Sequence, residues 1–144
     1  MELIFSLIFG LIVGSFLNVV INRLRIGKSV NGRSICPNCK HKLAPLDLVP
    51  VFSFIFLGGK CRYCGKPISW QYPVVEILTG ITFMCLASRA GSINIDLVFQ
   101  VVIASFFIVI AVYDLKHFLI LDKVILPGIV IATIYAIYQS FGNP

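Results

Sequence analysis

Four long apolar stretches constrain this 144-residue chain more than any other feature of its sequence. They cover residues 3–22, 68–87, 97–113 and 124–141, and each approaches the roughly 20 residues that a helix needs to cross a bilayer. Hydrophobic residues make up 58% of the chain and charged residues only 12%, about half the charged share of a typical soluble domain. The sequence therefore predicts an all-α polytopic membrane protein with about four transmembrane helices.

The positive charges predict how the helices are oriented. Nine of the twelve Lys and Arg residues lie between the first two apolar stretches, and short loops rich in Lys and Arg stay in the cytoplasm. We therefore expect a cytoplasmic first loop, an N-terminus outside and a retained first helix, since no cation or small-residue cleavage site marks a signal peptide. Because topology accounts for these cations, the net charge of +6 does not indicate nucleic-acid binding. The expected surroundings are the lipid bilayer.

The predicted organisation is a first transmembrane helix at 1–22, a cytoplasmic loop domain at 23–67 and three further helices at 68–144. Within the loop, residues 48–57 form an apolar run that is too short to span a membrane. Periodicity does not decide whether this run is the small core of the loop or lies at the membrane surface.

Two cysteine pairs in this loop predict a metal site. Cys36 and Cys39 are separated by two residues, as are Cys61 and Cys64, and twenty-one residues lie between the pairs. This spacing is typical of four thiolates that bind one tetrahedral Zn²⁺. Zinc with four cysteine ligands has no open position for water, so a structural role is expected. Disulfides are the alternative, and a cytoplasmic loop disfavours them.

The first apolar stretch carries a stripe of small and polar residues, Gly10, Gly14, Asn18 and Asn22, at successive i+4 positions. Small residues let another helix approach closely, and amides within a membrane need partners across the helix interface. We interpret the stripe mainly as helix packing. Participation of Asn18 in a site is the alternative.

Three of the six acidic residues, Glu76, Asp114 and Asp122, lie in or at the ends of apolar stretches on the predicted cytoplasmic side. An acid in this position is costly unless it is paired or functional. Asp114 is the candidate catalytic residue, with a simple helix-end acid as the alternative. Eight helical residues would separate Asp114 from Asp122 by about 12 Å, whereas carboxylates that share a proton lie about 3 Å apart. Asp122 is therefore interpreted as a helix-starting residue, and Glu76 as pairing with a cation or an amide, with a role in the chemistry as the equal alternative. Asp122, Glu76 and Asn18 are the candidate supporting residues of the site.

Six runs follow one another along nearly the whole chain: GLIVGSFLNVVINRL at 10–24, CPNC at 36–39, DLVP at 47–50, GKCRYC at 59–64, YPVVE at 72–76, and Asp114-Leu115 followed by Asp122. In this combination and order they resemble the type IV prepilin peptidases. The resemblance implies a membrane aspartic endopeptidase of the bacterial cytoplasmic membrane. It would remove the leader peptide from prepilins and pseudopilins at the cytoplasmic face, and many members then methylate the new amino terminus, which would require S-adenosylmethionine.

By this resemblance Asp114 matches the first catalytic aspartate of the family. Asp122 matches a second acid that is not the usual catalytic partner, and Leu121 stands where many relatives have proline. The family's other catalytic aspartate lies in a Gly-x-Gly-Asp motif, which these 144 residues do not contain. We therefore expect the chain to be a truncated product or a fragment that is inactive alone. A non-catalytic zinc-binding membrane adaptor or remnant is the alternative, and a small metal transporter is disfavoured because the cysteines lie in a loop.

Overall fold

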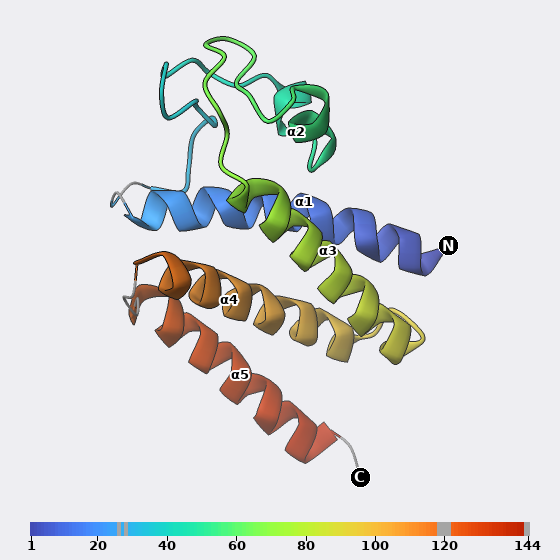
Figure 1. Ribbon diagram of the computed structural model, residues 1–144. Coiled ribbons are helices and arrows are strands. Elements are labelled where there is room, and N and C mark those ends of the chain that lie inside the picture. Colours follow the sequence, from blue (N-terminus) through green and yellow to red (C-terminus); the bar gives the residue numbers. More distant parts are fainter. Residues whose placement is uncertain (26, 28, 118–121, 143–144) are drawn as a thin grey trace.

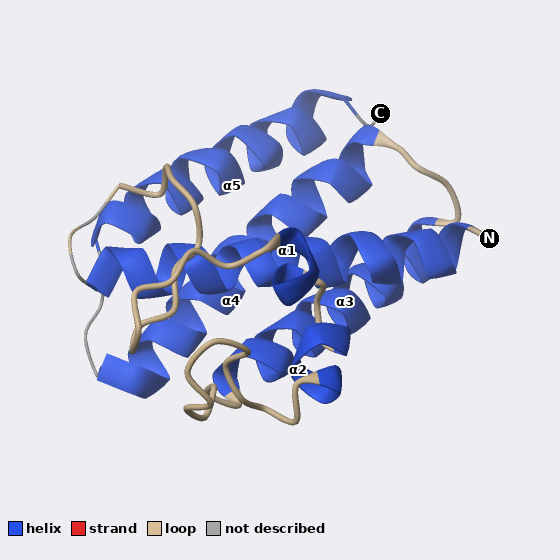
Figure 2. Cartoon of the chain, turned by 90° about the horizontal axis from the view of Figure 1, so that it is seen from above, coloured by secondary structure: helices blue, strands red, loops and turns tan. Residues whose placement is uncertain are grey.

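The computed structural model describes residues 1–25, 27, 29–117 and 122–142, which form helices and loops (Figure 1). The elements are α1 (Glu2–Arg25), the 3₁₀ helix η1 (Pro45–Leu48), α2 (Phe52–Phe56), α3 (Gln71–Ala90), α4 (Ile95–His117) and α5 (Asp122–Gly142). Within those residues no strand is present (Figure 2), and only two isolated β-bridges occur, both in the loop between α1 and α3. The predicted all-α fold is confirmed.

Three of these helices, α1, α3 and α4, are long and apolar enough to cross a membrane. The apolar part of α5, Val124–Ser140, is shorter, and Pro127 lies inside this helix. The predicted bounds of α3 were wrong by three residues at each end. Its C-terminal end lies at Ala90, where Gly91 takes a left-handed conformation (φ +68°). Its start is displaced because the backbone N–H of Ile68 donates to the Gly59 carbonyl (2.7 Å). Ile68 thereby belongs to the loop, and the helix begins at Gln71.

Helices α1 and α3 cross at their glycines. A Cβ atom added to Gly10 would lie 2.7 Å from the Gly80 Cα atom, and one added to Gly14 would lie 2.7 Å from the Glu76 Cα atom. Both distances are shorter than real Cβ contacts, so only glycine permits this approach. The small half of the predicted stripe therefore packs helix against helix, as is common in membrane bundles.

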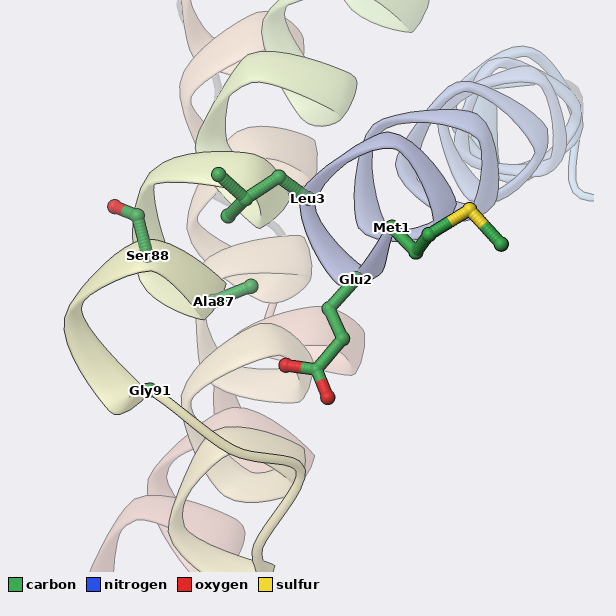
Figure 3. Close-up of a pocket in the computed structure, with 6 residues that line it drawn as sticks. All are labelled: Met1, Glu2, Leu3, Ala87, Ser88 and Gly91. Carbon is green, nitrogen blue, oxygen red and sulfur yellow. The ribbon is translucent and has the colours of Figure 1, made fainter.

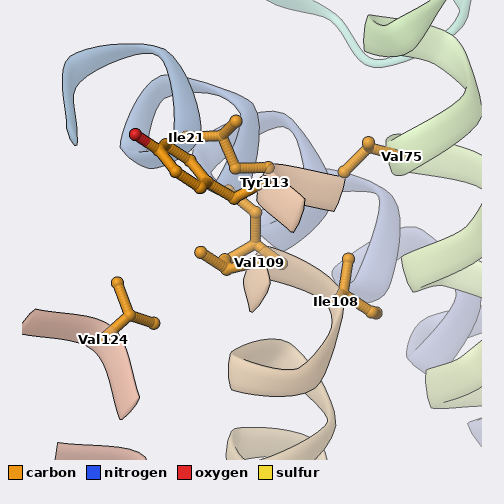
Figure 4. Packing of buried hydrophobic residues seen from close by; sticks show 7 residues of the cluster. Ile21, Val75, Ile108, Val109, Tyr113 and Val124 are labelled. Carbon is orange, nitrogen blue, oxygen red and sulfur yellow. The ribbon is translucent and has the colours of Figure 1, made fainter. Parts of the chain in front are cut away.

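A buried apolar cluster lies where the four long helices meet (Figure 4). It takes residues from the C-terminal halves of α1 and α4 and from the N-terminal parts of α3 and α5: Leu17, Ile21, Val75, Ile108, Val109, Tyr113 and Val124. The cluster therefore fixes the end of the bundle to which the long loop is attached. Many other large apolar side chains of these helices point outward, as lipid-facing surfaces require.

The long loop is fastened to the end of α1 by Arg23. Its guanidinium donates hydrogen bonds to four backbone carbonyls of the loop, those of Ser29, Asn31, Gly32 and Arg33, at 2.5–3.2 Å. Arginine presents its N–H donors in a rigid planar fork. One side chain therefore holds the chain as it leaves the helix toward the first cysteine pair.

Candidate metal centre and candidate carboxylates

The structure brings the four loop cysteines together. The sulfur atoms of Cys36, Cys39, Cys61 and Cys64 all lie within 4.8 Å of one another, and the Sγ atoms of Cys36 and Cys64 are 3.9 Å apart. A tetrahedral ion with Zn–S bonds of 2.3 Å requires sulfurs about 3.8 Å apart, whereas a disulfide requires about 2.05 Å. All four thiols are free, so the arrangement fits one metal ion and not two disulfides.

Two loop segments with the same backbone hydrogen bonds present these sulfurs. In the first knuckle, residues 34–43, the Cys36 N–H donates to the His41 carbonyl (2.9 Å) and the Lys40 N–H to the Cys36 carbonyl (3.0 Å). In the second knuckle, residues 59–68, Cys61 donates to Lys66 (2.9 Å) and Gly65 to Cys61 (2.9 Å). A β-bridge closes each knuckle, Ile35 with Lys42 and Lys60 with Pro67. The duplicated cysteine spacing therefore corresponds to a duplicated local structure.

The thiols shift one another's acidity. Burial raises the pKa of Cys36, but the backbone N–H groups of Cys39 and Asn38 and the neighbouring thiols lower it to about 7. The backbone N–H of Lys66 lowers the pKa of Cys64, but burial and the three other thiols raise it to about 11. Four thiols this close repel one another when ionised, so they cannot all ionise without a cation among them. A divalent metal ion would supply that positive charge.

Asp47 connects the second knuckle to η1. Its side chain is only 3% exposed and forms an ion pair with the Arg62 Nε atom (2.8 Å). The other carboxylate oxygen accepts hydrogen bonds from the Ala44 N–H (3.0 Å) and the Tyr63 hydroxyl (3.1 Å). Burial and this hydrogen bond to Asp47 raise the pKa of Tyr63. Sequence reasoning did not identify Asp47 as a site residue, because its side-chain partners, Arg62 and Tyr63, lie fifteen and sixteen positions away.

The two knuckles also touch through aromatic rings. His41 follows the first cysteine pair and stacks on Tyr63 of the second pair, with ring centroids 3.7 Å apart. Together with Asp47, this contact fixes the orientation of one cysteine pair relative to the other.

The polar half of the α1 stripe reaches the start of α3. The Asn18 side chain is fully buried; its amide donates to the Tyr72 carbonyl (3.1 Å) and accepts from the Gln71 amide (3.2 Å). Asn22 donates to the Tyr72 hydroxyl (3.0 Å). Gln71 in turn accepts a hydrogen bond from Lys116 of α4 (2.5 Å). The amides therefore tie together three helices at the end of the bundle that carries the loop.

Glu76 holds the loop against the helices. Its side chain is buried, and one carboxylate oxygen accepts a hydrogen bond from the Val51 N–H (2.8 Å). Val51 has a φ of +62°, which is rare and strained for a β-branched residue. The partners of Glu76 are thus a backbone amide of the loop and the Ser15 side chain of α1, and not a cation.

Asp114 lies in the last turn of α4 with an exposed side chain. Among the described residues, none forms a hydrogen bond or an ion pair with its carboxylate. It is adjacent to the buried Tyr113 and two residues from Lys116, which bonds the start of α3. The structure therefore places Asp114 at the same end of the bundle as the loop. Asp122 begins α5, as predicted, whereas its side chain is outside the described residues.

The pockets of the described chain are open grooves. One, about 360 Å³ in volume, lies between the start of α3 and the end of α4 and is lined by Gln71, Val74, Val75, Val112, Leu115 and Lys116. The other, about 380 Å³, lies at the opposite end of the bundle and is lined by Met1, Glu2, Leu3, Ala87, Ser88 and Gly91 (Figure 3). Of the two, only the first lies near the candidate catalytic residue.

Residues 8–90 match the model of the bacterial peptidase A24 N-terminal domain. The chain belongs to this family. It is 42% identical over 126 residues to a prepilin leader peptidase/N-methyltransferase of Myxococcus xanthus, a match that covers 87% of this chain and 37% of the relative. Proteins of the same name are 39% identical in Bacillus subtilis, covering 83% of this chain and 48% of the relative, and 35% identical in Klebsiella pneumoniae, covering 85% and 57%.

The A24 match begins in α1 and ends at the last residue of α3, so both knuckles, Asn18 and Glu76 lie inside it. The chain spans about half the length of the curated relatives it matches. No solved structure matched the chain. The predicted family resemblance is confirmed.

Proposed function

We propose that this chain forms part of a membrane aspartic endopeptidase that removes the leader peptide from type IV prepilins and pseudopilins. The observation that carries the proposal is the four-sulfur cluster within the A24 N-terminal match, on a loop bonded to the membrane helices through Glu76. We place the loop at the cytoplasmic face of the bacterial inner membrane and the N-terminus outside, because nine of twelve Lys and Arg residues lie in or next to the loop.

The metal in this proposal is zinc in a structural role. Four thiolates within 4.8 Å of one another match its preferred ligands and geometry. When bound, zinc would supply folding free energy to a loop that has little apolar core of its own. Exposed cations near the cluster, Lys40, Lys60, Arg62 and Lys66, would offset the net negative charge of four thiolates around a divalent ion.

Asp114 is the proposed catalytic residue of this chain. In an aspartic peptidase one ionised carboxylate accepts a proton from water while a protonated carboxyl donates to the scissile carbonyl, and the water attacks without a covalent intermediate. A single aspartate cannot fill both roles at once. We propose that Asp114 supplies one carboxyl group and that the second aspartate comes from outside these 144 residues, so that the chain alone is inactive.

The names of the relatives also include N-methyltransferase. We extend the proposal to methylation of the new amino terminus, with S-adenosylmethionine as the methyl donor. The substrates of both reactions would be prepilin or pseudopilin precursors, presented at the membrane surface beside the zinc loop.

A cleavage assay on the gene product that carries these residues tests the proposal. Asp114→Asn should abolish removal of a prepilin leader while the zinc content stays at one ion per chain. Cys36→Ser and Cys61→Ser should lower the zinc content first. Equal cleavage by Asp114→Asn and wild type would remove its catalytic role and favour the zinc-binding membrane adaptor.

A further inference from the structure

The short helix α2 and the turn before it expose large apolar side chains. Leu46 is 69% exposed, Phe52 58%, Ile55 66% and Phe56 84%. Of the apolar side chains of α2, only that of Phe54 packs against the loop, where its ring lies on Trp70 with centroids 4.9 Å apart and against Gly59. The four outward side chains, hereafter the α2 face, are too concentrated for an ordinary aqueous surface of so small a segment.

The hydrogen bond from Val51 to Glu76 determines where the α2 face lies along the membrane-spanning helices, and hence its depth relative to the bilayer. Glu76 lies five residues inside α3, about 7.5 Å along the helix axis from its first residue. On the other side its Cα atom contacts Gly14, near the middle of α1. Figure 1 accordingly shows α2 level with the middle of α1 and not beyond its end. Residues 51–56 are therefore held beside the membrane-spanning part of the bundle.

The surroundings at this depth are apolar. Val74, Ile77 and Leu78, which flank Glu76 in α3, are also exposed, and in a spanning helix such side chains face lipid. They lie on faces of α3 turned away from Glu76, so they show that α3 is exposed to lipid at this depth, and the α2 face is held at the same level on the side of α3 that Glu76 occupies. Exposed lysines of the two knuckles, Lys42, Lys60 and Lys66, would then lie toward phospholipid headgroups, which attract cations.

We propose that residues 46–56 insert into the bilayer leaflet on the loop side, with the α2 face among the acyl chains and Glu76 as the anchor. The bond from Val51 to Glu76 fits this role, because the Val51 N–H would otherwise lie in lipid without an acceptor. The insertion does not depend on the catalytic proposal.

The only tryptophan of the sequence, Trp70, makes a direct test possible. In a Trp70→Phe background, Phe56→Trp places a single indole on the α2 face. Val30→Trp in the same background is the matched control, because Val30 is also an exposed apolar residue but lies in the segment that Arg23 clasps beyond the end of α1. Both proteins are reconstituted in phosphatidylcholine and phosphatidylglycerol vesicles, and zinc content confirms that each loop is folded.

Phosphatidylcholine brominated near the headgroup end of its acyl chains should quench the emission of F56W by about half or more, while iodide in the buffer should have little effect. The V30W protein should show the opposite behaviour. Iodide quenching of F56W equal to that of V30W would overturn the proposal, since the α2 face would then lie in water. Protection of F56W from both quenchers would also overturn it, because protein and not lipid would cover the face.

The anchor is tested in the same F56W protein. Glu76→Ala removes the acceptor for the Val51 N–H, whereas Glu76→Gln retains an oxygen that can accept this bond. Quenching by the brominated lipid should fall markedly in E76A and stay near its original value in E76Q. Equal quenching in both, with zinc retained, would show that Glu76 does not hold the segment in the bilayer.

Discussion

The two knuckles have the same backbone but differ in how they join the rest of the molecule. Cys36 and Cys61, the first cysteine of each pair, are both buried, and the closing hydrogen bonds agree within 0.2 Å. The second knuckle carries Arg62 and Tyr63, which hold Asp47, whereas the first has Pro37 and Asn38 at the equivalent positions. The sulfur cluster therefore joins two similar turns, and one of them also organises the loop.

Loss of the proposed metal should have the largest effect, because both knuckles should unfold and the difference between them should disappear. Structural zinc contributes about 10–16 kcal/mol in small zinc-finger peptides, so Cys61→Ser and Cys36→Ser should each abolish tight zinc binding and unfold both knuckles. Amide hydrogen exchange should show lost protection over residues 34–68 and unchanged protection in α1, α3 and α4. Retained protection in either knuckle without metal would contradict the prediction.

Removal of Asp47 should show that the second knuckle depends on a contact that the first knuckle lacks. Asp47→Ala leaves Arg62 and the Ala44 N–H without their partner, at a cost of about 2 kcal/mol once the half-exposed position of Arg62 is considered. Chelator competition should show a zinc affinity lowered about 30-fold. Asn38→Ala, at the first-knuckle position equivalent to Tyr63, is the control and should change the affinity little. Equal losses in the two variants would show that Asp47 has no special role.

Gly65 and Lys40 occupy the same left-handed position in the two knuckles, with φ values of +69° and +60°. A Cβ atom at Gly65 would meet no other atom within 4 Å, so Gly65→Ala should cost only the conformational penalty, about 1 kcal/mol. Zinc affinity measured by chelator competition should fall about fivefold. An unchanged affinity would mean that the turn relaxes away from this conformation.

Lys40→Gly should have the smallest effect. It relieves the same left-handed strain, but it also increases the entropy of the unfolded loop and removes the bond from Lys40 Nζ to the Pro37 carbonyl (2.9 Å). These terms oppose one another, so the change in zinc affinity should correspond to less than about 1 kcal/mol. A loss as large as that for Gly65→Ala would show that the lysine side chain, and not its backbone, holds the first knuckle.

The sequence predicted the features that depend on local spacing. The four helices follow from apolar length, and the sulfur cluster follows from two cysteine pairs with a loop between them. The close approach at Gly10 and Gly14 was also visible as an i+4 stripe. The start of α3 was less predictable, because Ile68 is apolar like the helix that follows but donates its backbone N–H to the closing hydrogen bond of the second knuckle.

Contacts between distant residues could not be predicted from the sequence alone. The contacts of Asp47 with Arg62 and Tyr63, and the bond from Val51 to Glu76, join positions fifteen to twenty-five residues apart. These residues meet only because the sulfur cluster and the crossing of α1 and α3 bring distant parts of the chain together. The spacing of apolar residues in the sequence carries no information about such contacts. The catalytic role of Asp114 remains a prediction, because it depends on a second carboxyl group and not on the residues that now surround Asp114.

The glycine contact between α1 and α3 also determines how the loop can refold. Because α1 and α3, which bracket the long loop, are locked together at Gly10 and Gly14, the end of α1 and the start of α3 stay close even when the knuckles are open. The chain entropy of ring closure is thus already lost before zinc arrives. If the proposed zinc dissociated from one pair of thiols, the other pair would rebind it at high local concentration, because both pairs lie in one tethered segment.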